Sequence, residues 1–129
     1  MKKTIKVICA VINVENKILV AQRNYNMKLP LKWEFPGGKL EPNETEEECI
    51  LREIKEELNI DITLHRRLMP SFYEYPSVSI ELVPYLASFI GGKIELKDHK
   101  QYKLLRKKDL GRLDWSKADI PIVKKLIEL

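Results

Sequence analysis

Residues 36–59 restrict the fold more than any other part of this 129-residue chain. Pro36-Gly37-Gly38 predicts a break in the extended piece that precedes it. Thr45 and Glu48 have the spacing of a capping box, in which a hydroxyl and a carboxylate satisfy free amides at a helix start. Helix-compatible residues follow, and Asn59 tolerates the left-handed conformation that ends many helices. We therefore predict a helix that begins after Thr45 and ends before Asn59.

This helix is acidic although the whole chain is basic. Lys and Arg number 23 against 19 Asp and Glu, a net charge of +4. Eight of the acids crowd into one short stretch, as Glu41, Glu44, Glu46, Glu47, Glu48, Glu53, Glu56 and Glu57. The mild basic excess is compatible with a polyanionic ligand but lacks the concentrated basic stripe that is typical of nucleic-acid binders.

Three of these glutamates share one flank of the predicted helix. At about 100° per residue, positions i, i+3 and i+4 fall within about 100° of one another. They are Glu53, Glu56 and Glu57. We expect the apolar side chains that face the core to lie about 125° around the helix axis from these glutamates. This buried stripe would consist of Leu51, Ile54 and Leu58.

The crowded carboxylates have two interpretations. Like charges at these spacings repel, and a bound dication would remove the repulsion. Oxygen ligands with no His or Cys nearby favour Mg²⁺ or Mn²⁺ over zinc. Alternatively, the helix has a solvated acidic face on which Arg52 pairs with Glu56. The helix alone leaves both interpretations open.

The rest of the chain predicts a sheet with a second helix. Hydrophobic and β-branched runs predict strands over residues 4–14, 17–21, 33–35, 60–64, 70–75, 78–90 and 102–106. A turn is expected at Glu15-Asn16, a loop over residues 24–32, and a final helix over residues 119–129. Hairpins with two inserted helices predict an α+β fold, with helices packed on a mixed sheet in one domain over residues 1–129.

The spacing around the acidic helix matches a known pattern. From Gly38, five residues lead to Glu44, and seven more lead to Arg52-Glu53-Ile54-Lys55-Glu56-Glu57-Leu58-Asn59-Ile60. This resembles the signature of the Nudix hydrolases, and eight of its nine fixed positions match. Asn59 stands where the family has a Gly with positive φ, and Asn is the mildest departure from that Gly.

The resemblance extends to nearly the whole chain. It includes Ala21-Gln22-Arg23, the run from Trp33 to Lys39, and Ala118-Asp119-Ile120-Pro121. These pieces are similar to the MutT-like subgroup, which contains 8-oxo-dGTP diphosphatases and (d)CTP diphosphatases. The resemblance implies a single Nudix hydrolase domain over residues 1–129. Its fold would be an α/β/α sandwich, with the motif helix and a C-terminal helix on a mixed β-sheet.

The resemblance also implies an activity and a cofactor. Water would attack the β-phosphorus of a nucleoside triphosphate, releasing the monophosphate and pyrophosphate, with Mg²⁺ or, as a substitute, Mn²⁺. A triphosphate brings about four negative charges, which divalent ions must bridge beside glutamates. The implied metal ligands are the carbonyl of Gly37 and the carboxylates of Glu53, Glu56, Glu57 and Asp98.

Four residues carry further implied catalytic roles. Glu53 is the candidate to orient or deprotonate the water, and Asp98 is either an acid that assists or an ordinary loop carboxylate. Glu44 would support the metal site through hydrogen bonds or water. Arg52 would orient the carboxylates.

The implied substrate contacts lie outside the helix. Arg23 and Lys39, beside Gly38, are the expected phosphate contacts, and Glu34 either meets the sugar or holds its loop. Asp119 either reads the base edge or caps the final helix. A carboxylate only accepts hydrogen bonds, so a base-reading Asp119 favours the N–H groups of cytosine or 8-oxoguanine over uracil and thymine.

Several other side chains are expected to have structural roles. Two isolated cysteines, Cys9 and Cys49, predict packing residues in a reducing cytoplasm. The apolar run near the start lacks a cleavage site and predicts a strand, not a signal peptide. Trp115 is expected to pack in the core, and His65 and His99 are expected at the surface. The aromatic residues Phe72, Tyr73 and Tyr75 are either core residues or a stacking wall for the base.

The expected partner is a small-molecule nucleoside triphosphate, with no membrane and no stable nucleic-acid partner. The protein is expected to be a monomer or a homodimer. A non-catalytic Nudix-fold module that binds nucleotides or RNA is the alternative from a different class. Loss of the motif glutamates would indicate such a module, and all of them are present.

Overall fold

The computed structural model describes residues 2–128. The strands are β1 (Lys3–Val14), β2 (Lys17–Gln22), β3 (Trp33–Glu34), β4 (Gly37–Lys39), β5 (Ile60–Arg67), β6 (Ser71–Glu74), β7 (Val78–Gly92) and β8 (Gln101–Leu105). The helices are α1 (Glu46–Leu58) and α2 (Ile120–Glu128), with short 3₁₀ segments η1 (Lys107–Arg112) and η2 (Lys117–Asp119). No helix within residues 2–128 combines the length and the apolar character that a membrane span requires.

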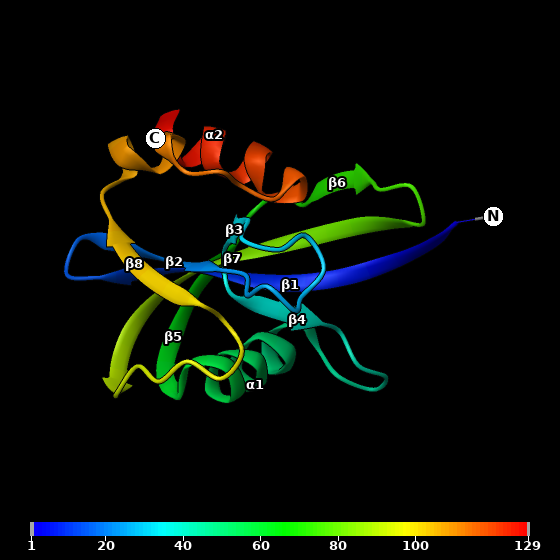
Figure 1. The fold of residues 1–129 in the computed structure, drawn as a ribbon. Helices are drawn as coiled ribbons and strands as arrows, with labels where there is room; N and C mark the ends of the chain where they lie inside the picture. The colour runs from blue at the N-terminus through cyan, green and yellow to red at the C-terminus, as the bar shows by residue number, and fades with distance from the viewer. Residues whose placement is uncertain (1, 129) are drawn as a thin grey trace.

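The strands of the described residues form one mixed sheet between two helical layers. The central order is β3-β2-β1-β7-β5, while β4 pairs with β1, β6 with β7 and β8 with β2. Strands β1 and β7 run parallel, and the other paired strands run antiparallel. Helices α1 and α2 cover opposite faces of this sheet (Figure 1). The α+β fold expected from the pattern of strands and helices is confirmed.

Strand β1 is almost continuously apolar because both of its faces are covered. Alternate side chains of a strand point to opposite faces of a sheet. Ile8 and Ile12 therefore pack with Ile54 in the core under α1, whereas Cys9 and Val11 belong to the core under α2. The adjoining turn at Glu15-Asn16 has positive φ at both residues (50° and 67°), as in tight two-residue hairpins.

Helix α1 begins and ends where its caps predict. The Thr45 hydroxyl accepts from the Glu48 amide (3.1 Å), and the Thr45 amide donates to the Glu48 carboxylate (2.9 Å). At the other end Asn59 is left-handed (φ 59°, ψ 32°), and its amide donates to the Lys55 carbonyl (3.0 Å). The substitution of Gly by Asn in the motif is thus accommodated by a conformation that Asn tolerates.

The buried face of α1 is rotated from the predicted one. Leu51 was expected in the stripe but is 44% exposed. The buried row is Cys49, Ile50, Ile54 and Leu58. Ile50 faces the sheet in place of Leu51. The helix is therefore rotated so that the motif carboxylates lie closer to the sheet than the predicted buried row would place them.

An ion cluster at the start of α1 ties three strands to the helix. The carboxylate of Glu46 accepts from Arg67 on β5 (2.8 Å), Lys6 on β1 (2.6 Å) and the Tyr85 hydroxyl on β7 (2.8 Å). The bonds from Arg67, Lys6 and Tyr85 lower the pKa of Glu46 from 4.5 to about 2. This depressed pKa is a source of stability that depends on pH.

We predict that Glu46→Gln destabilises the protein by about 2 kcal/mol at pH 7, a figure kept low because Lys6 and Arg67 are partly solvated. The contribution of the charge is complete above the unfolded pKa of 4.5 and is lost as pH falls toward 2. Urea denaturation at pH 7, 5 and 3 measures it. A difference between variant and wild type that does not shrink below pH 4.5 would contradict the prediction.

Candidate active site

Strand β4 brings two glycines against the sheet and the acidic helix. The predicted break interrupts the chain at Phe35-Pro36, but Gly37 and Gly38 continue as a strand paired with β1 at Cys9 and Ile8. A Cβ at Gly37 would collide with backbone of β1, and one at Gly38 would collide with the Glu53 carboxyl group. The glycines therefore serve close approach, which the interpretation as a simple breaker missed.

A single guanidinium organises the carboxylates of the motif. Arg52 donates to both oxygens of Glu44 (2.7 and 2.9 Å), to Glu53 (2.9 Å) and, more weakly, to Glu56 (3.3 Å). Glu44 also accepts from the Glu41 amide (3.0 Å). The alternative pairing of Arg52 with Glu56 is thus present, but within a larger network rather than on a merely solvated face.

The three carboxylates on this flank differ in how far they are buried. The side chains of Glu53 and Glu57 are 15% and 16% exposed, whereas that of Glu56 is 47% exposed. Burial raises the pKa of Glu53, against the opposing effect of Arg52, and burial together with the charges of Asp98 and Glu53 raises the pKa of Glu57. The hydrogen bond from Arg52 instead lowers the pKa of Glu44 to about 2. Glu53 and Glu57 are therefore two sheltered carboxylates whose surroundings disfavour the negatively charged form.

The segment of residues 93–100 runs beside the end of α1. The Glu95 amide donates to the Leu58 carbonyl (3.0 Å), and the Lys97 amide donates to the Glu57 carbonyl (3.2 Å). Asp98 is exposed, and its charge contributes to the raised pKa of Glu57. The backbone of this segment thus lies against the end of α1, and the role of Asp98 there stays a prediction.

His99 corrects one expectation. It was predicted at the surface, but its residue exposure is 7%. Its Nε2 lies 2.8 Å from Glu34 Oε2 and its Nδ1 lies 3.9 Å from Glu57 Oε2. The premise that no His lies near the acidic cluster was therefore wrong, whereas His65 is exposed as expected. No local pattern indicated this burial, because the chain bends at Lys97 and Asp98 and both residues are exposed, so there is no strand-like alternation.

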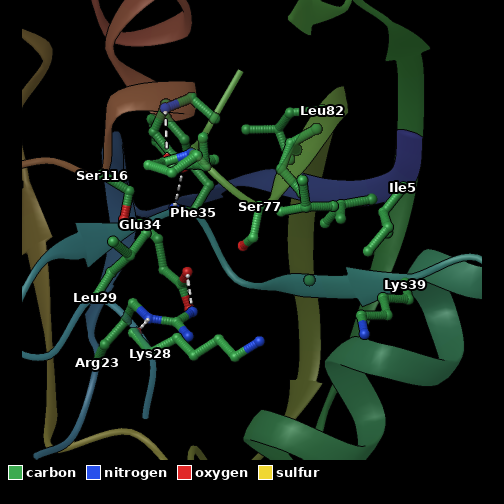
Figure 2. Close-up of a pocket in the computed structure, with 18 residues that line it drawn as sticks. Ile5, Arg23, Lys28, Leu29, Glu34, Phe35, Lys39, Ser77, Leu82 and Ser116 are labelled. Atoms are coloured by element: carbon green, nitrogen blue, oxygen red, sulfur yellow. Dashed lines mark hydrogen bonds and ion pairs between the residues drawn. The ribbon is translucent and has the colours of Figure 1, made fainter. Parts of the chain in front are cut away.

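A cavity of about 560 Å³ lies between β3, β4, β7 and η2. Its polar lining includes Arg23, Lys28, Glu34 and Lys39 (Figure 2). Arg23 Nη1 donates to Glu34 Oε1 (2.8 Å), and its Nε donates to the Lys28 carbonyl (2.5 Å). Lys28 was not singled out from the sequence, because a lysine in a polar loop has no motif to identify it.

Asp119 lies at the bottom of this cavity. It is 5% exposed, and its Oδ2 accepts from the Phe35 amide (3.0 Å). Its hydrogen bond thus reaches across to the β3–β4 connection rather than to the amides of α2, which weakens the interpretation as a helix cap. Burial first, and then the charge of Glu34, raise the pKa of Asp119 well above its ordinary value.

Of the three aromatic residues predicted as a possible stacking wall, Tyr75 lines the cavity. Its ring is 4.6 Å from that of Tyr73, with an interplanar angle of 70°. Both also pack against the core under α2, so the core interpretation is confirmed for them, and stacking of a base on Tyr75 stays a prediction. Phe72 is 70% exposed and does not line the cavity. Cys9, Cys49 and Trp115 are buried, as expected.

The chemistry of this flank suits a hard dication. Its groups are carboxylate oxygens and a backbone carbonyl, which Mg²⁺ prefers. The raised pKa values of Glu53 and Glu57 show charge that a cation would stabilise. Among residues 2–128, however, no three His, Cys, Asp or Glu side chains converge into a metal cluster. In the arrangement seen, Arg52 holds Glu53 and Glu56.

The chain is similar to known proteins in both sequence and fold. The sequence profile described as the NUDIX domain matches residues 2–126. A CTP pyrophosphohydrolase of Escherichia coli (strain K12) is 29% identical over 98% of this chain and 94% of its own length. An 8-oxo-dGTP diphosphatase of Proteus vulgaris is 39% identical over 67% of this chain and 79% of its own length.

A solved structure is similar over almost its whole length. It is described as DNA mismatch repair protein MutT, family Nudix hydrolase, from methicillin-resistant Staphylococcus aureus 252. The two chains are 41% identical with a TM-score of 0.80, and the match covers 99% of this chain and 98% of that one. This likeness confirms the layered fold that the sequence resemblance implied.

Proposed function

The chain belongs to the Nudix hydrolase family, and on that premise we propose that it is a Mg²⁺-dependent nucleoside triphosphate diphosphatase. It would cleave the phosphoanhydride bond of a (d)NTP to release the (d)NMP and pyrophosphate. The observation that carries the proposal is the adjacency of two parts. Gly38 joins them: the sheltered carboxyl group of Glu53 lies against it, while its neighbours Gly37 and Lys39 line a cavity that also contains Arg23 and the buried acid Asp119.

The residues divide the work between these two parts. Arg23 and Lys39, whose side chains line the cavity, bind the phosphates, and Gly38 leaves room for them beside Glu53. Arg52 and Glu44 hold the motif carboxylates in place. Glu53 orients the attacking water or accepts its proton. The raised pKa of Glu53 makes this carboxylate a stronger base than an exposed glutamate.

The proposed ligands of Mg²⁺, or of Mn²⁺ as a substitute, are the Gly37 carbonyl and the carboxylates of Glu53, Glu56, Glu57 and Asp98. When bound, the cation neutralises phosphate charge and lowers the pKa of water. Glu56, half-exposed and held only at 3.3 Å by Arg52, is the carboxylate that can reorient most easily. The site then acts on a small-molecule nucleotide, and we propose no stable nucleic-acid partner.

The proposed substrate is an oxidised purine nucleotide such as 8-oxo-dGTP, so the enzyme would clear damaged precursors of DNA from a cytoplasmic nucleotide pool. The name of the Proteus relative supports this choice. The Escherichia relative favours a second candidate, (d)CTP or a broader set of pyrimidine triphosphates. The raised pKa of Asp119 keeps both open. A neutral carboxyl group can donate as well as accept, so the argument from an acceptor alone no longer restricts the base.

Steady-state pyrophosphate release from 8-oxo-dGTP, dGTP, dCTP, CTP and dTTP with Mg²⁺ tests the substrate. We expect the highest kcat/KM for 8-oxo-dGTP. Equal values for 8-oxo-dGTP and dGTP would reject nucleotide-pool sanitation, and a preference for dCTP would establish the second candidate. Binding of nucleotides with no turnover of any of them would indicate the non-catalytic module.

We predict that Asp119→Ala raises KM for the preferred nucleotide by about tenfold or more, because a buried hydrogen bond to a charged or acidic group is lost. The ratio of kcat/KM values between nucleotides with different bases should fall toward one. The exposed Asp114, which pairs with Lys32, provides the control variant Asp114→Ala. An unchanged ratio of kcat/KM values between bases in Asp119→Ala would exclude a role for this residue in reading the base.

A further inference from the structure

We propose that His99 is a positioning residue, which holds Glu34 and through it the Arg23 guanidinium at the rim of the cavity. The inference rests on the proposed function, in which Arg23 binds phosphate, and it adds a residue that the Nudix motif does not contain. The imidazole lies between the nucleotide cavity and the carboxylate flank, and its side chain is only 3% exposed.

The contacts form a continuous chain. His99 Nε2 is 2.8 Å from Glu34 Oε2, and Glu34 Oε1 accepts from Arg23 Nη1 at 2.8 Å. Both oxygens of Glu34 are therefore engaged, one on each side. A carboxylate held at both oxygens has one orientation, so the guanidinium that it pairs with is also held.

The backbone around His99 is fixed independently of the ring. On one side the Lys97 amide donates to the Glu57 carbonyl at the end of α1 (3.2 Å). On the other side the Lys100 amide donates to the Gln22 carbonyl at the end of β2 (2.9 Å). The segment thus bridges α1 and β2, and the ring reaches Glu34 on β3 from a rigid support.

The environment of Nδ1, the second ring nitrogen, indicates that His99 does more than fill space in the core. Nδ1 is buried with no hydrogen-bond partner among the described residues, and Glu57 Oε2 is 3.9 Å away. An unpaired buried nitrogen lowers stability, so an apolar ring would fill this space at less cost. The nitrogen that is engaged is Nε2, and because a carboxylate accepts, Nε2 carries the proton.

Three variants separate the two nitrogens. The amide of His99→Gln reaches the position of Nε2 and can still donate to Glu34, whereas that of His99→Asn occupies the position of Nδ1 and cannot. His99→Leu removes both ring nitrogens. Calorimetric titration with 8-oxo-dGMP and with dCMP, in EDTA to exclude metal ions, measures nucleotide affinity without turnover.

We expect affinity within about twofold of wild type for His99→Gln, and about tenfold weaker for His99→Asn and His99→Leu. In turnover assays the loss should appear in KM rather than in kcat. Equal affinities for wild type, Asn and Leu would overturn the proposal, as would a Gln variant as weak as Leu. A Gln variant that loses affinity while Asn retains it would assign the role to the nitrogen near Glu57 instead.

A measurement on the wild-type protein requires no variant to fold. The ¹⁵N and ¹H spectra of the imidazole are expected to show a proton on Nε2, and a neutral ring protonated only on Nδ1 would overturn the proposal. If the wild type releases no pyrophosphate from any nucleoside triphosphate with Mg²⁺, the proposed function fails, while the spectrum still decides whether His99 donates to Glu34. The two failures are therefore distinguishable.

Discussion

Glu53→Gln is expected to lower kcat by about a thousandfold while the protein folds as well as wild type, because in the proposed function this carboxylate handles the attacking water and binds metal. The amide keeps the shape of the side chain. Since burial raises the pKa of Glu53, the charged form is disfavoured where it lies, and a neutral isostere relieves that cost. We therefore expect the midpoint of thermal unfolding to stay the same or rise.

Glu47→Gln is the matched control, since Glu47 is exposed in the first turn of the same helix. Its turnover should equal that of wild type. Pyrophosphate release under saturating substrate and Mg²⁺, measured together with thermal unfolding, separates catalysis from folding. Turnover of Glu53→Gln within a few fold of wild type would reject the assignment of this residue.

Gly38→Ala is expected to lower turnover by about a hundredfold, the effect of displacing a reacting group by about 1 Å. The added methyl group would collide with the Glu53 carboxyl group. Strand β4 cannot retreat, because Gly38 pairs with Ile8 of β1. The side chain of Glu53 must move instead, away from Arg52.

Gly91→Ala is the control for this substitution, because a Cβ at Gly91 meets nothing within 4 Å. Gly37→Ala provides a second comparison, since its clash is with the backbone of β1 and should reduce stability rather than turnover alone. Assays of kcat alongside urea denaturation measure both effects. A Gly38→Ala enzyme as active as Gly91→Ala would show that the close approach of β4 has no role in the reaction.

Local sequence patterns predicted the elements whose causes are local. The capping box at Thr45, the left-handed Asn59 and the turn at Glu15-Asn16 depend on neighbouring residues alone, and each is present. The spacing from Gly38 to Ile60 predicted the acidic helix and its resemblance to a family. Such features are set within a few residues of chain.

Features that depend on tertiary contacts were predicted less well. The exposure of Leu51 depends on which row of α1 meets the sheet, and a helical pattern alone does not determine that rotation. Strand β4 exists because β1 lies close enough to pair with two glycines. The burial of His99 requires the segment before β8 to cross from α1 to β2. Each is decided by residues distant in the sequence.

We expect the wild-type protein to split a nucleoside triphosphate between the α- and β-phosphates with the help of a divalent cation. Phosphorus NMR of the products formed from 8-oxo-dGTP and from dCTP, with and without Mg²⁺, tests it most directly. We expect nucleoside monophosphate and pyrophosphate, and only when Mg²⁺ is present. Nucleoside diphosphate with inorganic phosphate, or equal turnover in EDTA, would contradict it.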